Sequence, residues 1–277
     1  MTTTIPRPPV VVTGAASGIG AALVRILHDQ GVTVIGVDRI EGDGTLGCDL
    51  ADEVAIAELV NRLPAQIGGL ANVAGVPGTA PPATILRVNV LGPRLLSDAL
   101  QPRLVADSAI VSVASVAAHN NAQHDDSLEL LHRAQSADDI DAWLESHPID
   151  GTAAYDTSKR VVVDAMMRRA AALLGSGVRA LSISPGPVET PILGDFTATM
   201  GQHRMDRAVA TVGRHGRPEE IAAVVAFCLS PAATWLNGID ILVEGGLMAA
   251  RRAAELHIDA TTSAPSTQSP TSGGSTS

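Results

Sequence analysis

Two residues four positions apart, Tyr155 and Lys159, are the only tyrosine and the only lysine of the chain. On a helix, residues at this spacing are neighbours, and such a pair often has no function. Chemistry favours a functional pair here. A compact ammonium beside a phenol lowers the phenol pKa and can also reach sugar hydroxyls, which a bulky guanidinium does poorly. The spacing therefore predicts an acid–base catalyst.

A glycine-rich turn near the N-terminus predicts a phosphate-binding site. An apolar run over residues 10–12 leads into this turn, and a helical pattern follows over 18–30. Backbone amides of such a turn can approach a pyrophosphate at the positive end of the helix. Glycines needed only for packing are the alternative. The predicted cofactor-binding residues of the turn are Gly14, Ser17, Gly18, Ile19 and Gly20.

The second apolar run ends at Asp38, about 20 residues beyond the glycines, where a carboxylate can bind both ribose hydroxyls of a dinucleotide. Its charge would repel a 2′-phosphate, so NAD is the predicted cofactor, although Arg39 follows directly and could attract that phosphate. Asp49 and Leu50 are predicted to contact the adenine of the cofactor. Asp49 could equally be a surface acid at the start of the next helix.

The rest of the chain alternates short apolar runs with helical patterns, which is typical of βα units. We predict strands over 10–12, 32–37, 70–73, 109–113, 178–183 and 239–243. We predict helices over 18–30, 52–63, 86–105, 154–174 and 218–229. The fold class is therefore α/β, with a doubly wound parallel sheet, helices on both faces and a single folded domain over 1–256. Residues 257–277 have the composition of a disordered tail.

Composition excludes several classes of protein. The chain has 277 residues, 45% of them hydrophobic, and a formal net charge of −10, which argues against nucleic-acid binding. We see no secretory signal, and the uncharged stretch over 10–24 is too short and too rich in glycine to span a membrane. Cys48 and Cys228 are far apart in sequence, which indicates reduced thiols and a cytoplasmic protein.

Residues 119–150 interrupt the βα alternation. The segment contains eight acidic residues against one arginine, which accounts for −7 of the net charge. Apolar residues at helical intervals predict two short amphipathic helices, inserted between a strand and the helix of Tyr155. The histidines of the segment, at 119, 124, 132 and 147, match no known metal-binding spacing, so we predict no metal site.

Taken in order, the motifs of the chain resemble those of the classical short-chain dehydrogenase/reductase family, from about residue 10 to about residue 246. The matching residues are Thr13-Gly14, Gly18-Ile19-Gly20, Asn72-Val73-Ala74-Gly75, Asn89, Ser115, Tyr155-Asp156-Thr157-Ser158-Lys159, Pro185-Gly186-Pro187-Val188-Glu189-Thr190, Asn237-Gly238 and Val243-Glu244-Gly245-Gly246. The resemblance implies a Rossmann-type fold. Val73 departs from it, because the family usually has a second Asn there. Ser115 and Tyr155 are also farther apart in sequence than is usual for the family, because the insertion lies between them. An insertion at this place resembles the bacterial 3α-hydroxysteroid dehydrogenase/carbonyl reductase subgroup.

The resemblance assigns the catalytic roles. Tyr155 would be the general acid or base, and Lys159 would lower its pKa and hold the nicotinamide ribose. Ser115 would bind the substrate oxygen, although Ser112 is a rival on sequence alone. Asn89 would hold a water that links Lys159 to solvent, unless it only caps or kinks a helix.

Further cofactor contacts follow from the same resemblance. The residues implied are Asn72, Ala74, Gly75, Pro185, Gly186, Val188 and Thr190. For the substrate we predict an apolar pocket, with no basic residue between 190 and 202 to bind an anion. Its predicted lining residues are Val116, Ala117, Leu193, Phe196 and Met200.

The predicted activity is therefore NAD-dependent interconversion of an apolar secondary alcohol and a ketone, such as a 3-hydroxysteroid. A smaller alicyclic or aromatic alcohol or a dihydrodiol is the alternative substrate, and a non-catalytic NAD-sensing protein is the alternative of another class. Because the insertion lies ahead of the Tyr155 helix, which family members use for assembly, we predict a homodimer through residues 218–229 and the last strand. Alternatively, the insertion covers the substrate cleft, with Trp143 as a wall.

Overall fold

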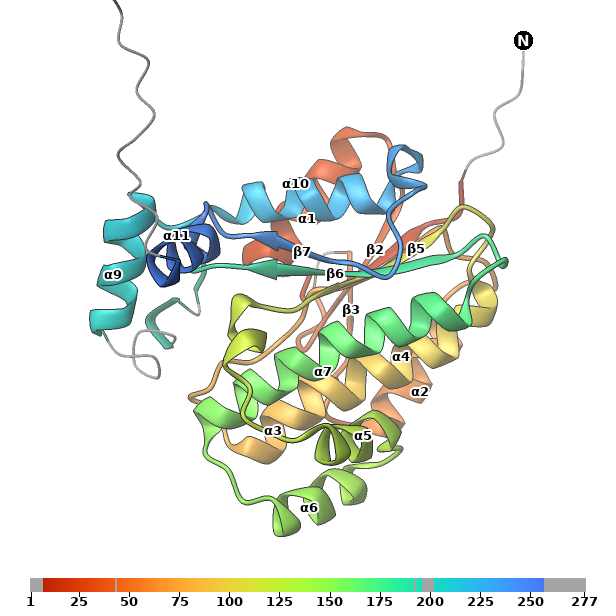
Figure 1. Ribbon diagram of the computed structural model, residues 1–277. Coiled ribbons are helices and arrows are strands. Elements are labelled where there is room, and N and C mark those ends of the chain that lie inside the picture. Colours follow the sequence, from red (N-terminus) through yellow and green to blue (C-terminus); the bar gives the residue numbers. More distant parts are fainter. Residues whose placement is uncertain (1–6, 43, 192, 196–201, 257–277) are drawn as a thin grey trace, which may run out of the picture.

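The computed structural model describes residues 7–42, 44–191, 193–195 and 202–256. Its centre is a seven-stranded parallel sheet with the order β3-β2-β1-β4-β5-β6-β7 (Figure 1). The strands are β1 (Val10–Thr13), β2 (Val34–Asp38), β3 (Thr45–Gly47), β4 (Gly69–Asn72), β5 (Ala109–Val113), β6 (Arg179–Pro185) and β7 (Asp240–Val243). The parallel sheet predicted from sequence is confirmed.

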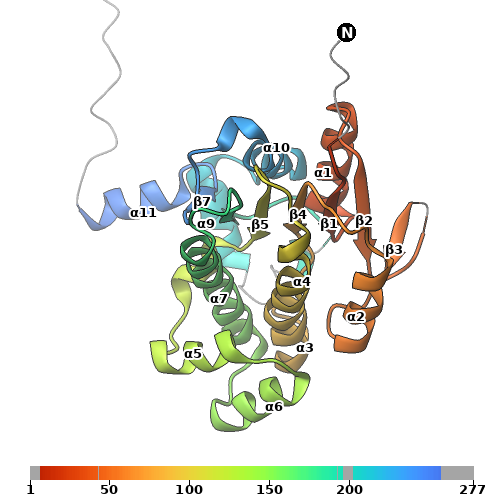
Figure 2. The same ribbon diagram turned by 90° about the vertical axis from the view of Figure 1, so that its right-hand side faces the viewer.

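Helices cover both faces of the sheet (Figures 1 and 2). On one face lie α1 (Gly18–Asp29) and α10 (Pro218–Leu229). Together with the strand side chains that point to this face, they form a core of Val, Leu, Ile and Ala. On the other face lie α2 (Glu53–Arg62), α4 (Gly92–Leu100) and α7 (Gly151–Ala172), over a second core. Because both faces are covered, the four residues of β1 are all buried, as is typical of a parallel strand.

The strand order reverses between β1 and β4, since the chain winds from β1 through β2 to β3 and then returns to β4 beside β1. At such a point the loops after neighbouring strands diverge and leave a crevice at the carboxyl ends of the strands. The glycine turn after β1 and the motif after β4 both lie at this edge. The topology thus places the predicted cofactor residues together.

The prediction of one continuous helix over 86–105 is wrong. This part of the chain instead forms four consecutive elements, α3 (Pro82–Leu86), a π-helical turn (Arg87–Leu91), α4 and a 3₁₀ turn (Gln101–Arg103). Short π turns are uncommon and are often found at functional sites. The side chain of Asn89, in the middle of the π turn, bonds to the backbone of Val76 instead of facing solvent.

Several smaller elements were not predicted from the sequence. The 3₁₀ turns are Val116–Asn120 and Pro231–Ala233, and the additional helices are α9 (Gln202–Val212) and α11 (Leu247–Glu255). In Figure 1, α9 and α11 lie side by side at one end of the sheet. Helix α7 begins at Gly151, three residues before the predicted start, because the Asp150 side chain accepts a hydrogen bond from the Ala153 amide at 2.8 Å.

The insertion forms the two predicted helices, α5 (Asp125–Arg133) and α6 (Ala137–Ser146). They lie on the side of α3 and α7 that faces away from the sheet (Figures 1 and 2). Trp143 is buried between them with Leu128, Leu131 and Ile140, and its indole Nε1 donates to the carbonyl of Ser127 at 2.8 Å. The prediction of Trp143 as a wall of the substrate cleft is therefore wrong, because its ring is buried in an apolar cluster that joins the insertion to Leu86, Leu91 and Val161.

None of the helices in the described part of the chain is long and apolar enough to span a membrane. The predicted tail over 257–277 lies outside the described residues.

Candidate active site

A cavity of about 560 Å³ opens at the carboxyl ends of the central strands. It collects most of the residues predicted from sequence as catalytic or cofactor-binding. Those that line it are Gly14, Ser17, Gly18, Ile19, Gly20, Asp38, Asp49, Leu50, Ala74, Gly75, Ser115, Tyr155, Lys159, Pro185, Gly186, Val188 and Thr190. These residues come from seven segments that are far apart in sequence, so their meeting in one cavity is a result of the fold.

The glycine turn after β1 packs closely against the end of β4. Gly14 has a φ of +70°, and a Cβ added to it would lie 2.9 Å from the backbone nitrogen of Ala74. The Thr13 hydroxyl accepts hydrogen bonds from the amides of Val73 and Ala74, at 3.0 and 3.1 Å. This contact holds the first turn of α1 beside the Ala74–Gly75 segment, so that free amides at the helix start face the cavity.

Asp38 ends β2 at the rim of the cavity. Its carboxylate accepts hydrogen bonds from the backbone amides of Ala16 and Arg39, at 3.0 and 2.7 Å. These two bonds fix the direction of the carboxylate toward the glycine turn. Arg39 also lines the cavity. The rim at this end thus offers a fixed anion and, next to it, a cation.

Cys48, Asp49 and Leu50 form another part of the wall. Asp49 accepts a hydrogen bond from the Ala51 amide at 2.9 Å, whereas the N-cap of α2 is Asp52. The alternative of Asp49 as the cap of that helix is therefore wrong. Burial, with smaller effects of Asp49 and Asp52, raises the pKa of the Cys48 thiol to about 11. Cys48 is thus a protonated thiol near neutral pH.

Tyr155 and Lys159 lie one turn apart on α7, with exposed fractions of only 9% and 6%. The Lys159 Nζ is 5.5 Å from the centre of the Tyr155 ring and donates to the carbonyl of Val113 at 3.1 Å. Burial lowers the pKa of Lys159 to about 8. Such a lysine can gain or lose a proton near neutral pH, as a proton relay requires.

Ser115 follows β5 and lines the cavity beside Tyr155. Burial raises the pKa of Tyr155 above its ordinary value, while a hydrogen bond with Ser115 lowers it. The rival serine is placed elsewhere. Ser112 lies in the buried part of β5, where its hydroxyl accepts from Asn72 and contacts the sulfur of Met166.

Asn89 is buried just behind the cavity, next to Lys159 and Gly75. Its side chain pairs with Val76, accepting from the amide at 2.9 Å and donating to the carbonyl at 3.0 Å. It also donates to Ser158 Oγ at 3.2 Å. A Cβ added to Gly75 would lie 3.2 Å from Asn89 Oδ1 and 3.5 Å from Lys159 Nζ. Gly75 thus keeps a narrow space open between the two.

Other predicted residues do not line this cavity. Asn72 lies beneath it and donates to Ser97 and Ser112. Val116 and Ala117 are buried in a 3₁₀ turn, and Leu193 also lies outside the cavity wall. Phe196 and Met200 lie outside the described residues.

Sequence reasoning missed part of the wall as well. The missed residues are Val37, Cys48, Ala51, Val73, Val76, Pro77, Thr84, Val88, Val113, Ala114 and Pro187. Val76 and Pro77 directly follow the Asn72–Gly75 motif, so continuing that motif by two residues could have found them. Thr84 and Val88 carry no sequence signal, because only the break between α3 and the π turn places them at the cavity.

Within the described ranges, no three His, Cys, Asp or Glu side chains lie together in a way that could hold a metal ion.

Comparison with known proteins identifies the family. The family model described as "short chain dehydrogenase" matches residues 9–125, and one described as "Enoyl-(Acyl carrier protein) reductase" matches residues 141–248. The chain is 37% identical over 246 residues to a coniferyl-alcohol dehydrogenase of a Pseudomonas species, covering 86% of this chain and 95% of that one. It is 32% identical over 253 residues to the 3-alpha-hydroxysteroid dehydrogenase/carbonyl reductase of Comamonas testosteroni, covering 88% and 97%.

A solved structure supports the same assignment. The 3-alpha-hydroxysteroid dehydrogenase of Pseudomonas sp. B-0831, complexed with NADH, has a TM-score of 0.77 and is 33% identical, covering 88% of this chain and 98% of that one. The fold agrees with that of this structure over most of both chains. The chain belongs to the short-chain dehydrogenase/reductase family.

Proposed function

We propose that this chain is an NAD(H)-dependent oxidoreductase that interconverts an apolar secondary alcohol and a ketone. The observation that carries the proposal is the convergence of Ser115, Tyr155 and Lys159 at one cavity wall. The cavity also presents the glycine turn and the Asp38 carboxylate, which fit a dinucleotide. The residues support catalysis over the NAD-sensing alternative, because a sensor would need the dinucleotide site but no buried acid–base pair.

Each catalytic side chain has a distinct task in this proposal. The Ser115 hydroxyl binds the substrate oxygen, and the Tyr155 hydroxyl gives its proton to that oxygen in reduction or takes it in oxidation. Lys159 stabilises the tyrosinate and binds ribose hydroxyls, while Asn89 positions a water for the proton relay. A bound nicotinamide would supply or accept the hydride.

NAD is the proposed cofactor because Asp38 is fixed at the rim by two backbone amides. A carboxylate held in this way can accept hydrogen bonds from ribose hydroxyls and repels a 2′-phosphate. Arg39 beside it favours NADP. The 3-alpha-hydroxysteroid dehydrogenase of known structure is complexed with NADH, which supports the preference for NAD.

Replacing Asp38 with Asn tests this preference. The variant keeps the shape of the side chain and removes only its charge. We expect NAD to bind about 10- to 100-fold more weakly, since hydrogen bonds to charged groups contribute about 1.5–3 kcal/mol, and NADP to bind more tightly. Titration of both dinucleotides measures the effect, with Asp29→Asn, at the exposed end of α1 and outside the cavity wall, as the matched control. An unchanged NAD/NADP ratio would contradict the role of Asp38.

The substrate end of the cavity is apolar, with Val76, Pro77, Val188 and Pro191 among its lining residues. Such a wall fits a steroid or another alicyclic carbonyl, and none of these four residues carries a charge that could bind a carboxylate. The coniferyl-alcohol dehydrogenase relative favours a second candidate, an aromatic alcohol, which the same apolar wall can accommodate.

The test of function is turnover, followed by nicotinamide absorbance with a matched panel of substrates. The panel contains 3-hydroxysteroids with their ketones, coniferyl alcohol, and a small alicyclic alcohol, each with NAD(H) and NADP(H). Turnover of the steroids supports the first proposal, and turnover of coniferyl alcohol alone supports the second. Tight NAD binding without turnover of any compound would favour the NAD-sensing protein.

The proposed assembly is a homodimer through α10 and β7. This face exposes Phe227 and Ile239, and Trp235 beside them has an exposed fraction of 97%. β7 is also an edge strand, so one of its sides is open for pairing. Light scattering should give the mass of a dimer for the wild type and of a monomer for Phe227→Asp. A tetramer would contradict this arrangement.

The proposed location is the cytoplasm. The two cysteines are buried and free, which supports this location.

A further inference from the structure

The two hydroxyl groups proposed for catalysis belong to segments joined by an unusually long stretch of chain. Ser115 is the N-cap of the 3₁₀ turn Val116–Asn120, and Tyr155 lies in the second turn of α7. Between them lie α5 and α6. Hydrogen bonding between the two hydroxyls requires their positions to hold to within a fraction of an ångström, and a long connection alone does not provide this.

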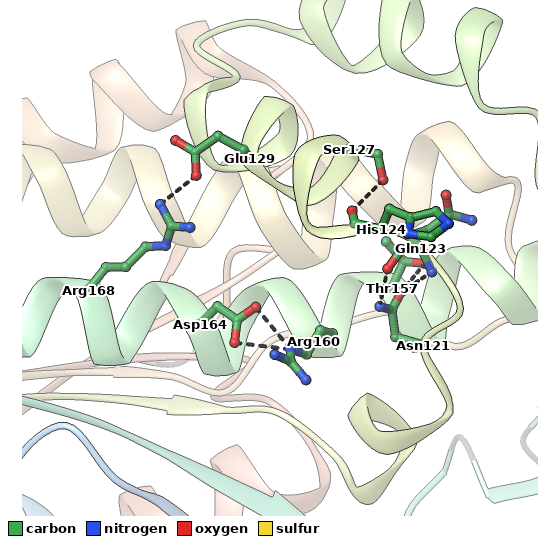
Figure 3. A network of polar contacts seen from close by, with 9 residues as sticks. All are labelled: Asn121, Gln123, His124, Ser127, Glu129, Thr157, Arg160, Asp164 and Arg168. Atoms are coloured by element: carbon green, nitrogen blue, oxygen red, sulfur yellow. Dashed lines mark hydrogen bonds and ion pairs between the residues drawn. The ribbon is translucent and has the colours of Figure 1, made fainter.

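A partly buried hydrogen-bond network closes the base of this connection (Figure 3). The Thr157 hydroxyl, on the α7 turn of Tyr155, donates to Asn121 Oδ1 at 3.1 Å. The same oxygen accepts from the Gln123 amide at 3.2 Å, and the Asn121 Nδ2 donates to the Gln123 carbonyl at 3.1 Å. We call Asn121 and Thr157 the clasp.

The position of the clasp relates it to catalysis. Thr157 is two residues after Tyr155 and is 1% exposed, while Asn121 directly follows the 3₁₀ turn that begins at Ser115. The Ser115 Oγ accepts from the Ala117 amide at 3.1 Å, so the hydroxyl and the start of the turn move together. A bond from the end of that turn to α7 therefore acts together with the packing of Ala117 against Tyr155 to limit the movement of Ser115 relative to Tyr155.

The insertion also contacts α7 in two other ways, through a buried apolar cluster that joins Leu128, Leu131 and Trp143 to Val161, and through ion pairs. Glu129 of α5 pairs with Arg168 of α7 at 2.6 Å on the surface (Figure 3). It also pairs with Arg133 of its own helix at 2.8 Å. Such exposed pairs typically contribute well under about 1 kcal/mol, and they lie at the far end of the helix from Tyr155. These ion pairs involve neither the turn after Ser115 nor the part of α7 around Tyr155, so we expect them to have no effect on the hydrogen bond between Ser115 and Tyr155.

We infer that Asn121 and Thr157 are positioning residues that hold Ser115 against Tyr155 and separate the catalytic pair from movements of the insertion. The inference rests on the proposed function for its catalytic meaning. Its structural part, that the bond between Thr157 and Asn121 ties the turn after Ser115 to α7, does not depend on the proposed function.

The single tyrosine allows a test that needs no substrate. In protein labelled with a carbon isotope at tyrosine Cζ, one NMR resonance reports the hydrogen bonding of the Tyr155 hydroxyl. Ser115→Ala defines the resonance position without the hydrogen bond. We expect Thr157→Val, which keeps the volume and removes the donor, to move the resonance most of the way to that position. Asn121→Ala should do the same, Thr157→Ser should restore the original position, and the control Glu129→Gln should leave it unchanged.

Kinetics on the same proteins test the consequence for catalysis. With the substrate found active, Thr157→Val should lower kcat about tenfold with little change in the KM for NAD, because the displaced hydroxyl affects the reaction and not the binding of cofactor. A Thr157→Val resonance that stays at the wild-type position would overturn the inference, whatever the turnover. A wild-type protein that turns over no alcohol would instead overturn the proposed function, while the resonance still decides the role of the clasp.

Discussion

Replacing Tyr155 with Phe should lower kcat/KM about 10³-fold, within the range that a positioned general acid or base contributes. The variant loses one oxygen and keeps the ring, which is buried with Ile85, Ala117 and Ala154. We therefore expect the fold and the affinity for NADH to remain close to those of the wild type. Steady-state turnover and NADH fluorescence on the same preparation measure the two quantities.

Ser115→Ala is the matched control for the tyrosine variant. It removes the partner that lowers the Tyr155 pKa but leaves the acid itself in place, so its loss of turnover should be smaller. If Tyr155→Phe keeps activity within about tenfold of the wild type, the proton comes from another group and the proposed mechanism fails.

Replacing Lys159 with Met should abolish turnover and at the same time make the nucleotide-free protein more stable near neutral pH. Burial lowers the pKa of Lys159 from 10.5 to about 8, so the folded protein holds the ammonium at a cost. At about 1.4 kcal/mol per pKa unit this cost is about 3 kcal/mol. Methionine removes the charge but leaves the Val113 carbonyl without its donor, and a net gain of about 1–2 kcal/mol remains.

The pH dependence of stability separates this effect from general changes in packing. Between about pH 8 and pH 10.5 the unfolded wild type binds more protons at Lys159 than the folded protein, so wild-type stability should rise with pH across this window. Lys159→Met should lack that rise. Tyr155 acts in the opposite direction above about pH 10, because the folded state keeps its proton longer. Urea unfolding at several pH values measures both slopes, and a variant less stable than the wild type near pH 7 would contradict the argument.

The fold was predictable where the sequence repeats a strong local pattern. Six strands follow apolar runs, and each lies within about two residues of its predicted position. β3 (Thr45–Gly47) escaped prediction because three partly buried residues at a sheet edge leave no alternation to detect. The π turn over Arg87–Leu91 escaped for another reason. Its cause is the pairing of Asn89 with Val76, a tertiary contact that local helix preference does not encode.

The site was predictable to the extent that its residues belong to recognisable motifs. Ser115, Tyr155 and Lys159 needed only spacing and resemblance. Val116 and Ala117, although next to Ser115, turn into the protein because the 3₁₀ turn directs them toward the core. Thr157 lies in a recognised motif, but its pairing with Asn121 carried no signal in sequence, since the two residues are 36 positions apart.

The placement of the insertion also has a consequence for the chain entropy of folding. β5 and β6 are paired neighbours, with Ala109 opposite Arg179, and residues 119–150 nearly double the length of chain between them. Each doubling of a flexible connection costs only roughly 0.6 kcal/mol in closure entropy. That is less than the loss from removing one buried methylene group, at about 0.8 kcal/mol. The polypeptide can therefore lengthen between the two hydroxyls proposed for catalysis almost without thermodynamic penalty.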